Sequence, residues 1–309
     1  MSKRIVPALI LAFLAVPVLL NGRALYEGMF FYLRDMATYN PRAVTPIKPE
    51  GRYASVYELV RLRNVERLAY VRQRLDLPTI TVTPIAIPSS PFSNLFVYFG
   101  DASGPYTIFS AHYDKLHDHA DYQGASDNTA AVSVLLAAID ELARRGDGGN
   151  RAFLFTGEEE TGLRGAQAFV EYARANRVPI RALVNFDNVG CGNLAIRPSA
   201  ERSGFVFTVP LLGDFVYDGH DFKTSPPYPL ANARLTQELV RVQPSLVVYE
   251  HFTARSDSNV FQANGIDTVI LSSDDMYHLQ LTWHTAADRV ELLDERSLDR
   301  AFELIMKYK

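Results

Sequence analysis

The spacing of apolar residues changes from helical to strand-like at Pro78. Between Ala54 and Leu75, apolar side chains recur every three or four positions, the period of a helix with one buried face. Ile80–Ile87 and Leu95–Phe99 then alternate or run apolar and are rich in β-branched and aromatic residues, a pattern typical of strands. The globular region is therefore predicted to begin with a helix and two strands.

Short apolar strands alternate with helices over most of the remaining chain. The predicted strands are Tyr106–Ala111, Arg151–Thr156, Ala182–Phe186, Ser245–Tyr249 and Thr268–Ser272, and the predicted helices are Thr129–Arg144, Leu163–Ala175 and Ser297–Met306. Alternation of this kind places helices on both faces of a sheet whose strands run mainly parallel. We therefore expect an α/β fold with a mostly parallel central sheet between two helical layers.

Two segments lack a clear period. Residues 25–53 are aromatic and then proline-bearing, and we expect them to form a connector. Residues 198–244 contain many prolines and loop signals, and we interpret them as an insertion over the site rather than a second domain. The main domain is therefore expected to span residues 54–309.

Residues 1–24 form a separate segment. Lys3 and Arg4 precede an apolar run from Ile5 to Leu20, which fits a secretory signal. The run is short for a spanning helix, which needs roughly 20 apolar residues. A cleaved signal peptide and an uncleaved membrane anchor are equally favoured, and a buried N-terminal helix is the third interpretation. The first two both export the main domain, and the anchor would attach it to a membrane through residues 5–20.

Composition narrows the classes of function. The 309 residues are 48% hydrophobic and 21% charged, which is ordinary for a globular protein. The net charge of −4 provides no basic surface for nucleic acid, so we expect no nucleic-acid partner. Cys191 is the single cysteine, which excludes an internal disulfide framework and a multi-cysteine zinc site. Any metal must therefore be held by histidines and carboxylates.

Acidic and imidazole side chains follow three predicted strands. His112 and Asp114 come directly after the first strand, the triple glutamate 158–160 follows the second, and Asp187 follows the third. Ligands bind at the carboxyl ends of strands in open α/β sheets. Crowded carboxylates repel one another and raise each other's pKa unless a cation intervenes. The pattern therefore predicts a divalent metal at this edge of the sheet.

Two further residues are candidate ligands. Asp127 stands in GASDN at the start of a predicted helix, where an aspartate is an ordinary N-cap but where a carboxylate can also bridge two cations. Beside the strand-end cluster, the ligand role is favoured. His284, in WHTAAD, is either a loop histidine or a further ligand. Asp114 is spaced to accept a hydrogen bond from the imidazole of His112 and so fix its tautomer.

Six short motifs follow one another along the chain. They are HYD at 112–114, GASDNTAAV at 124–132, FTGEEETGLRGA at 155–166, NFDNVG at 185–190, SDSNVFQANGI at 256–266 and HTAAD at 284–288. In this order they resemble the two-zinc aminopeptidase family. That family includes secreted bacterial leucyl aminopeptidases, plasma glutamate carboxypeptidase, the glutaminyl cyclases and the catalytically dead transferrin receptor ectodomain. The resemblance covers residues 54–309 and implies a zinc peptidase domain acting on peptides or aminoacyl amides.

The resemblance also implies a role for each candidate residue. Five side chains would hold two zinc ions: His112 and Asp187 one ion, Glu160 and His284 the other, and Asp127 both. Glu159 would be the general base, because the family's base immediately precedes the metal-binding glutamate. Glu158 is then extra, either a bystander or a contact for the substrate amine. His/carboxylate ligands suit zinc but also accept manganese or cobalt.

Some positions depart from the family pattern. Several family peptidases have tyrosine before the last histidine, where this chain has Trp283; Tyr277 and His278 are candidate substitutes. Ser258 stands where histidine is frequent. We expect a metallo-aminopeptidase, with a glutaminyl-cyclase-like acyltransferase and a non-catalytic binding ectodomain as alternatives. A serine hydrolase is disfavoured because no G-x-S-x-G motif is present.

Overall fold

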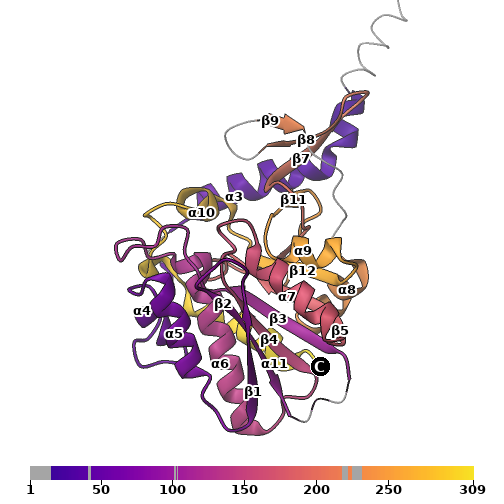
Figure 1. Ribbon diagram of the computed structural model, residues 1–309. Coiled ribbons are helices and arrows are strands. Elements are labelled where there is room, and N and C mark those ends of the chain that lie inside the picture. The colour runs from indigo at the N-terminus through magenta and orange to yellow at the C-terminus, as the bar shows by residue number, and fades with distance from the viewer. Residues whose placement is uncertain (1–14, 41–42, 101, 103, 218–221, 225–231) are drawn as a thin grey trace, which may run out of the picture.

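An eight-stranded sheet forms the centre of the molecule in the computed structural model, which describes residues 15–40, 43–100, 102, 104–217, 222–224 and 232–309 (Figure 1). The strand order is β1-β2-β4-β3-β5-β12-β6-β10. The bounds are β1 Ile80–Ala86, β2 Ser93–Phe99, β3 Tyr106–His112, β4 Arg151–Thr156, β5 Ile180–Phe186, β6 Leu194–Arg197, β10 Val247–Val248 and β12 Asp267–Ser273. The neighbouring strands β4, β3, β5 and β12 run parallel, and β1 and β2 are antiparallel additions at one edge. The predicted α/β class with a mostly parallel sheet is confirmed.

Helices cover both faces of this sheet. The bounds are α4 Ser55–Leu59, α5 Asn64–Arg74, α6 Ala130–Arg145, α7 Arg164–Ala175, α8 Ala233–Val242, α9 Ser258–Ala263 and α11 Glu295–Lys307. Apolar side chains of α4, α5, α6, α8 and α11 share one buried core, and those of α7 and α9 share the other. The strands between the two cores are buried on both faces, which explains why they read as continuous apolar runs. The helix expected over 54–75 is divided into α4 and α5.

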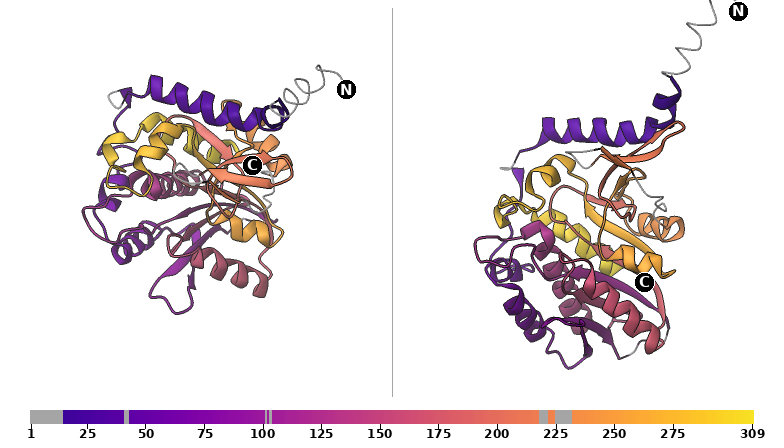
Figure 2. Two further views of the ribbon diagram at one scale, coloured as in Figure 1. Left: turned by 90° about the horizontal axis from the view of Figure 1, so that it is seen from above. Right: turned by 45° about the horizontal axis from the view of Figure 1, so that its top comes forward.

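A second, four-stranded sheet lies at one end of the molecule (Figure 2). Its order is β11-β7-β8-β9, with bounds β7 Gly204–Val209, β8 Gly213–Tyr217, β9 Phe222–Thr224 and β11 Phe252–Thr253. This sheet and α8 occupy most of the described part of 198–244. A small apolar cluster around Tyr249 and Met276 joins it to the main body. The segment therefore contains regular structure where the sequence predicted mainly loops.

Residues 22–38 are helical, although a connector was expected from residue 25 onward. The consecutive elements are α2 Gly22–Leu25, the π-helical turn η1 Tyr26–Phe31 and α3 Tyr32–Thr38. They form one rod that lies across the end of the body, beside the β7–β8 hairpin and over α10 Met276–Thr282 (Figure 2). Within the described residues, no helix has both the length and the apolar character to cross a membrane. Most of the predicted signal or anchor, residues 1–14, lies outside the described residues.

Candidate metal centre

Strand register brings the predicted ligands to one edge of the main sheet. His112 is the last residue of β3 and pairs with Thr156, the last residue of β4. Asp187 directly follows β5, and its backbone N–H donates to the carbonyl of Leu271 in β12 at 2.9 Å. Parallel strands end at the same edge, so the residues that follow them converge there. The prediction of a metal site at this edge of the sheet depended on this convergence.

Asp127 lies between the two histidines. One carboxylate oxygen, Oδ1, is 3.1 Å from Nε2 of His112, and the other, Oδ2, is 3.5 Å from Nε2 of His284. His112 Nε2 is also 3.7 Å from Oδ1 of Asp187, and His284 Nε2 is 3.4 Å from Oε2 of Glu160. The five candidate ligands therefore form an unbroken series in which each donor atom faces the next.

These separations fit a pair of zinc ions. Bonds of about 2.1 Å that meet near the tetrahedral angle separate two donor atoms by about 3.4 Å. Within the described part of the chain, His112, Asp127 and Glu160 form the one group of three potential ligands whose donor atoms all lie within 4.8 Å of one another. Glu160 Oε1 is buried and has no hydrogen-bond partner. A buried oxygen without a partner is costly unless a cation or water satisfies it, so the donor set fits metal.

Asp288 holds the loop that carries Asp127. Its Oδ1 accepts from the backbone N–H of Ser126 at 2.8 Å and from the Ser126 hydroxyl at 2.7 Å, and its Oδ2 accepts from the backbone N–H of Asp127 at 3.0 Å. The Asp288 side chain is buried. Sequence reasoning assigned it no role, although it closes the HTAAD motif. It fixes the position from which Asp127 reaches both histidines.

Asp114 links two strand ends. Its backbone carbonyl lies 3.1 Å from His112 Nδ1, and its carboxylate oxygen Oδ1 lies 3.6 Å from the same nitrogen. The two carboxylate oxygens accept from the backbone N–H groups of Glu159 and Glu160, each at 3.2 Å. The residue predicted to orient the His112 imidazole therefore also positions the turn that follows β4.

The site attracts positive charge. Burial lowers the pKa of His112, but the carboxylates of Asp114, Asp127 and Asp187 outweigh it and raise that pKa well above its usual value. His284 behaves in the same way, with a pKa raised to about 10 against the effect of burial. Both imidazoles face more carboxylate charge than their own protons neutralise. Cations bound among these side chains would replace the protons on the histidines.

Three acids of the site hold their protons unusually strongly, whereas the hydrogen bonds from His112 and His284 outweigh burial and lower the pKa of Asp127. Burial, followed by the nearby carboxylates, raises the pKa of Glu159 well above its usual value and that of Glu160 to about 7. Burial also raises the pKa of Asp257 to about 7. Asp257 accepts a hydrogen bond from the Thr156 hydroxyl and has a second buried oxygen without a partner. It is an additional acid of this edge that the sequence reasoning did not single out.

The Glu158 side chain contacts residues outside the group of candidate metal ligands. It accepts a hydrogen bond from the Ser90 hydroxyl, and its Oε2 lies 2.6 Å from Nη1 of Arg164. Glu158 thus ties the turn after β4 to the start of α7. These contacts favour the bystander interpretation over contact with a substrate amine.

The candidate substitutes for the family tyrosine make contacts of their own. Tyr277 packs edge-on against Tyr32 and Tyr39 of the N-terminal segment. His278 is buried, with Nε2 2.8 Å from the sulfur of Cys191. The ring of Trp283 lies 4.3 Å from the ring of His284 and is 41% exposed. Trp283 is therefore the member of the three with a contact to a candidate ligand.

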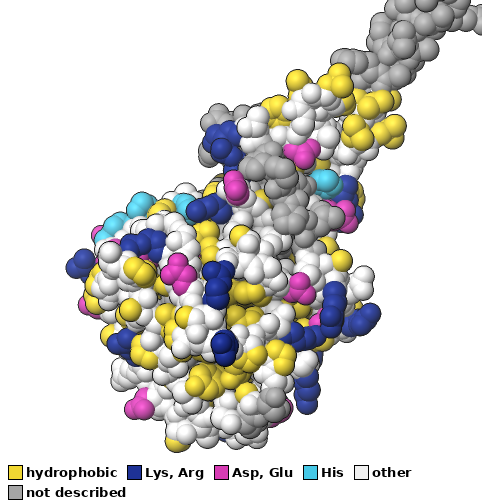
Figure 3. Space-filling view, turned by 45° about the vertical axis from the view of Figure 1, so that its right-hand side comes forward, with side chains coloured by type: hydrophobic (Ala, Val, Ile, Leu, Met, Phe, Trp, Pro, Cys, Tyr) yellow, Lys and Arg dark blue, Asp and Glu magenta, His cyan; other side chains and the backbone are white. Residues whose placement is uncertain are grey.

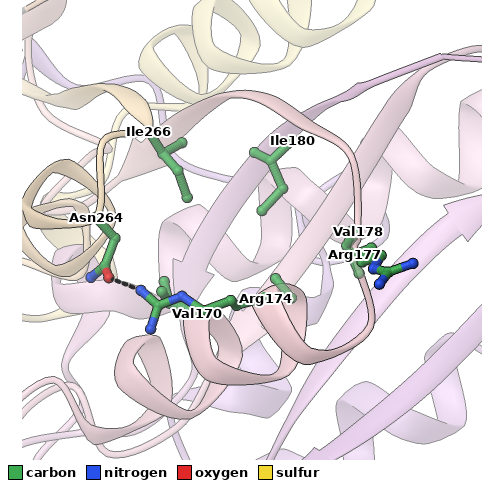
Figure 4. A pocket seen from close by; sticks show the side chains of 8 residues that line it. Val170, Arg174, Arg177, Val178, Ile180, Asn264 and Ile266 are labelled. Atoms are coloured by element: carbon green, nitrogen blue, oxygen red, sulfur yellow. Dashed lines mark hydrogen bonds between the residues drawn. The ribbon is translucent and has the colours of Figure 1, made fainter.

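A groove elsewhere on the surface has a different character (Figure 4). It lies between α7 and the segment before β12, where Arg174 donates to Asn264 above Val170, Ile180 and Ile266. Ile180 begins β5 and Ile266 precedes β12, so the groove lies at the opposite ends of the strands from His112. Among the described residues that line it, none is an acid or a histidine. The acids and histidines of the candidate metal centre therefore lie at the other edge of the sheet, where the parallel strands end.

Comparison with known proteins finds proteins that are similar to this chain in sequence or in fold. A vacuolar membrane protease of Candida tropicalis is 26% identical over 201 residues, which are 64% of this chain and 19% of that protein. The chain thus spans about a fifth of that relative's length. The Legionella pneumophila LapA aminopeptidase superposes with a TM-score of 0.62 at 15% identity, over 87% of this chain and 69% of that chain.

A glutaminyl cyclase from an Acidobacteriales bacterium has the same fold, with a TM-score of 0.58 at 14% identity over 88% of this chain and 97% of that chain. Residues 94–309 match the sequence pattern of peptidase family M28, and they contain all six motifs and every candidate ligand. The resemblance found in the sequence is confirmed at the level of the family. This chain belongs to peptidase family M28.

Proposed function

We propose that this protein is a two-zinc aminopeptidase. In this proposal His112 and Asp187 hold one ion, Glu160 and His284 hold the other, and Asp127 holds both. The observation that carries it is the series of donor separations from 3.1 to 3.7 Å, close to the spacing of ligands around tetrahedral zinc. Manganese or cobalt would fit the same donors.

The residues of the site have separate tasks. Bound zinc ions acidify water and polarise the scissile carbonyl. The Glu159 carboxylate takes a proton from the attacking water and later donates it to the leaving nitrogen. A general base works best when its pKa lies near the working pH. Burial favours a basic Glu159, and Asp114 holds its backbone through the N–H group.

Glutamine at position 159 tests the assignment. Glu159→Gln removes the basic oxygen, and we expect turnover of aminoacyl chromogenic amides to fall by about 10²–10⁴-fold, the usual contribution of a general base. Metal content should remain at two ions, whereas Asp127→Ala should lose metal as well. Glu158→Gln is the matched control, because it makes the same change one residue away, at a side chain paired with Ser90 and Arg164. Turnover that survives Glu159→Gln would refute the assigned base.

The reaction product separates the proposal from its alternative. A peptidase releases the N-terminal amino acid, whereas a glutaminyl cyclase closes the ring of an N-terminal glutamine. A substrate panel that includes a glutaminyl peptide therefore distinguishes the two. The complete set of five candidate ligands favours hydrolysis, because the cyclases use essentially one zinc.

The location and division of the chain are part of the proposal. We infer that the catalytic domain, residues 54–309, is exported, with residues 1–24 as signal peptide or anchor. The apolar run at 5–20 supports this inference, and so does the word membrane in the name of the Candida tropicalis relative. Reaction of an externally added, membrane-impermeant protease with the domain in intact cells tests it.

A further inference from the structure

The N-terminal rod, residues 22–38, buries two acidic side chains, Glu27 and Asp35, against the protein. Glu27 is completely buried, and its carboxylate accepts from the three backbone N–H groups of residues 250–252 at 2.7 to 3.1 Å. Asn21, just before the rod, exchanges two hydrogen bonds with the backbone of β7. Asp35 is buried and accepts from the first backbone N–H of α10 at 2.8 Å. Specific polar contacts therefore fix the rotation of this helix.

The opposite side of the rod is apolar and exposed. Tyr26, Met29, Leu33 and Met36 are between 45% and 60% exposed. Their spacing of three, four and three residues places them on one stripe of a helix. In a soluble globular protein such a stripe normally faces the core. Here a second apolar stripe faces outward, in addition to Phe31 and Tyr32, which pack against the apolar cluster around Tyr249 and Met276.

The tip of the β7–β8 hairpin extends this apolar surface. Leu211 and Leu212 at the turn are 105% and 71% exposed. The hairpin lies beside the start of the rod, because Asn21 bonds to Thr208 in β7. Helical residues 15–20, just before the rod, add Val16, Val18, Leu19 and Leu20, which are 43% to 79% exposed. Figure 3 shows hydrophobic side chains gathered on this projecting part of the molecule.

We propose that this surface, the exposed stripe of the rod together with the hairpin tip, lies in the interfacial layer of a lipid bilayer. An apolar helical face that lies in the plane of a membrane sinks about 5–10 Å into the boundary between headgroups and acyl chains. The stripe is continuous along the chain with the apolar run that ends at Leu20. In this proposal the apolar run at 5–20, the stripe and the hairpin tip all contact the same lipid bilayer.

The shape of the surface favours lipid over a second copy of the chain. A stable protein interface buries about 800 Å² on each partner and requires complementary shapes. One helix and a two-residue tip form a narrow ridge that projects from the body (Figure 1). Fluid lipid adapts to a ridge, whereas a second folded protein must provide a matching groove. Exposed apolar patches of this kind mark interaction sites and are uncommon on monomeric soluble proteins.

The proposed surface lies at the same end of the sheet as the candidate metal centre. The rod packs over α10, and His284 follows the end of α10 by two residues. Contact with a bilayer through the rod therefore holds the metal centre close to the membrane surface. This inference concerns attachment and does not depend on the identity of the reaction.

Site-directed fluorescence tests the contact in the full chain reconstituted in phosphatidylcholine vesicles. An environment-sensitive dye is attached at Met29→Cys or Leu211→Cys, and the control is Val65→Cys on α5, an apolar position that is 58% exposed on the catalytic body. Cys191 is buried and is not expected to react with the dye in the folded protein. We expect a blue shift and quenching by shallow spin-labelled lipids at positions 29 and 211, and neither at position 65.

Three outcomes would overturn the proposal. The first is equal quenching at all three positions, and the second is no quenching at any of them. The third is a blue shift that persists without lipid and grows with protein concentration, which would assign the surface to a second copy. Leu33→Ser combined with Met36→Ser should reduce quenching at position 211 while hydrolysis in detergent solution is unchanged. Because hydrolysis is measured separately, loss of activity and loss of membrane contact are distinguishable.

Discussion

Replacement of Asp288 by asparagine tests how the candidate bridging ligand is held. Asp288 accepts three hydrogen bonds with its two oxygens, from the backbone and hydroxyl of Ser126 and from the backbone of Asp127. Asparagine retains one oxygen, and its NH₂ group cannot accept from the remaining donor. An unpaired buried donor costs about 1–3 kcal/mol. Metal requires the loop in this position, whereas the metal-free loop can shift to pair the donor, so the cost falls on the metal-bound state. Since about 1.4 kcal/mol corresponds to a factor of ten, metal affinity should then fall about 5- to 150-fold.

The assay is competition for zinc between the protein and a chelating dye. Loss of an outer hydrogen-bond partner of a metal ligand typically costs about 10–100-fold in affinity, which agrees with the estimate from the unpaired donor. Asp140→Asn is the control, because it makes the same substitution at a half-exposed residue of α6 that pairs with Arg74. Wild-type zinc affinity in Asp288→Asn would refute the role assigned to this carboxylate.

Three further predictions concern stability. Glu27→Ala leaves three backbone N–H groups without their acceptor, and one unpaired buried donor costs about 1–3 kcal/mol, so urea unfolding should show a loss of at least this size, with faster amide exchange at residues 250–252; unchanged exchange there would contradict the contact. Burial lowers the pKa of His278 from its usual 6.5 to about 4, so the unfolded chain binds more protons between these values. Stability should therefore fall as the pH drops from 6.5 toward 4, and the urea midpoint of His278→Gln should depend less on pH in this range. Removal of metal by a chelator should lower the melting temperature, and zinc at 100 times its dissociation constant should restore about 2.7 kcal/mol; a melting curve indifferent to zinc would contradict metal binding in the folded state.

The central sheet was predictable because its strands are buried on both faces. Runs such as Arg151–Thr156 contain almost no polar interruption, and the predicted bounds match β4. The rod at 22–38 could not be found in this way, because periodicity arguments assume that apolar residues face inward. Here Glu27 is buried and Met29 is exposed. β6 is also short, and its four residues are too few to show a period.

The candidate centre was predictable where a residue follows a strand. His112 and Asp187 could be placed from register alone, because parallel strands end together. The hydrogen bonds that hold the candidate ligands in position could not be predicted in that way. Asp288 reaches Ser126 across 162 positions, and Asp257 reaches Thr156 across 101. Such pairings depend on how loops pack, which spacing along the chain does not encode.

The bonds made by Asp114 have a consequence for exchange of the metal ion. They hold the backbone of Glu159 and Glu160 through protein groups alone, so the alignment of the proposed base does not require a particular ion. Cobalt or manganese in place of zinc should then leave the proton acceptor where it is. Differences in the rate of the proposed reaction among these forms of the protein would report the acidity that each ion confers on water rather than a rearranged pocket.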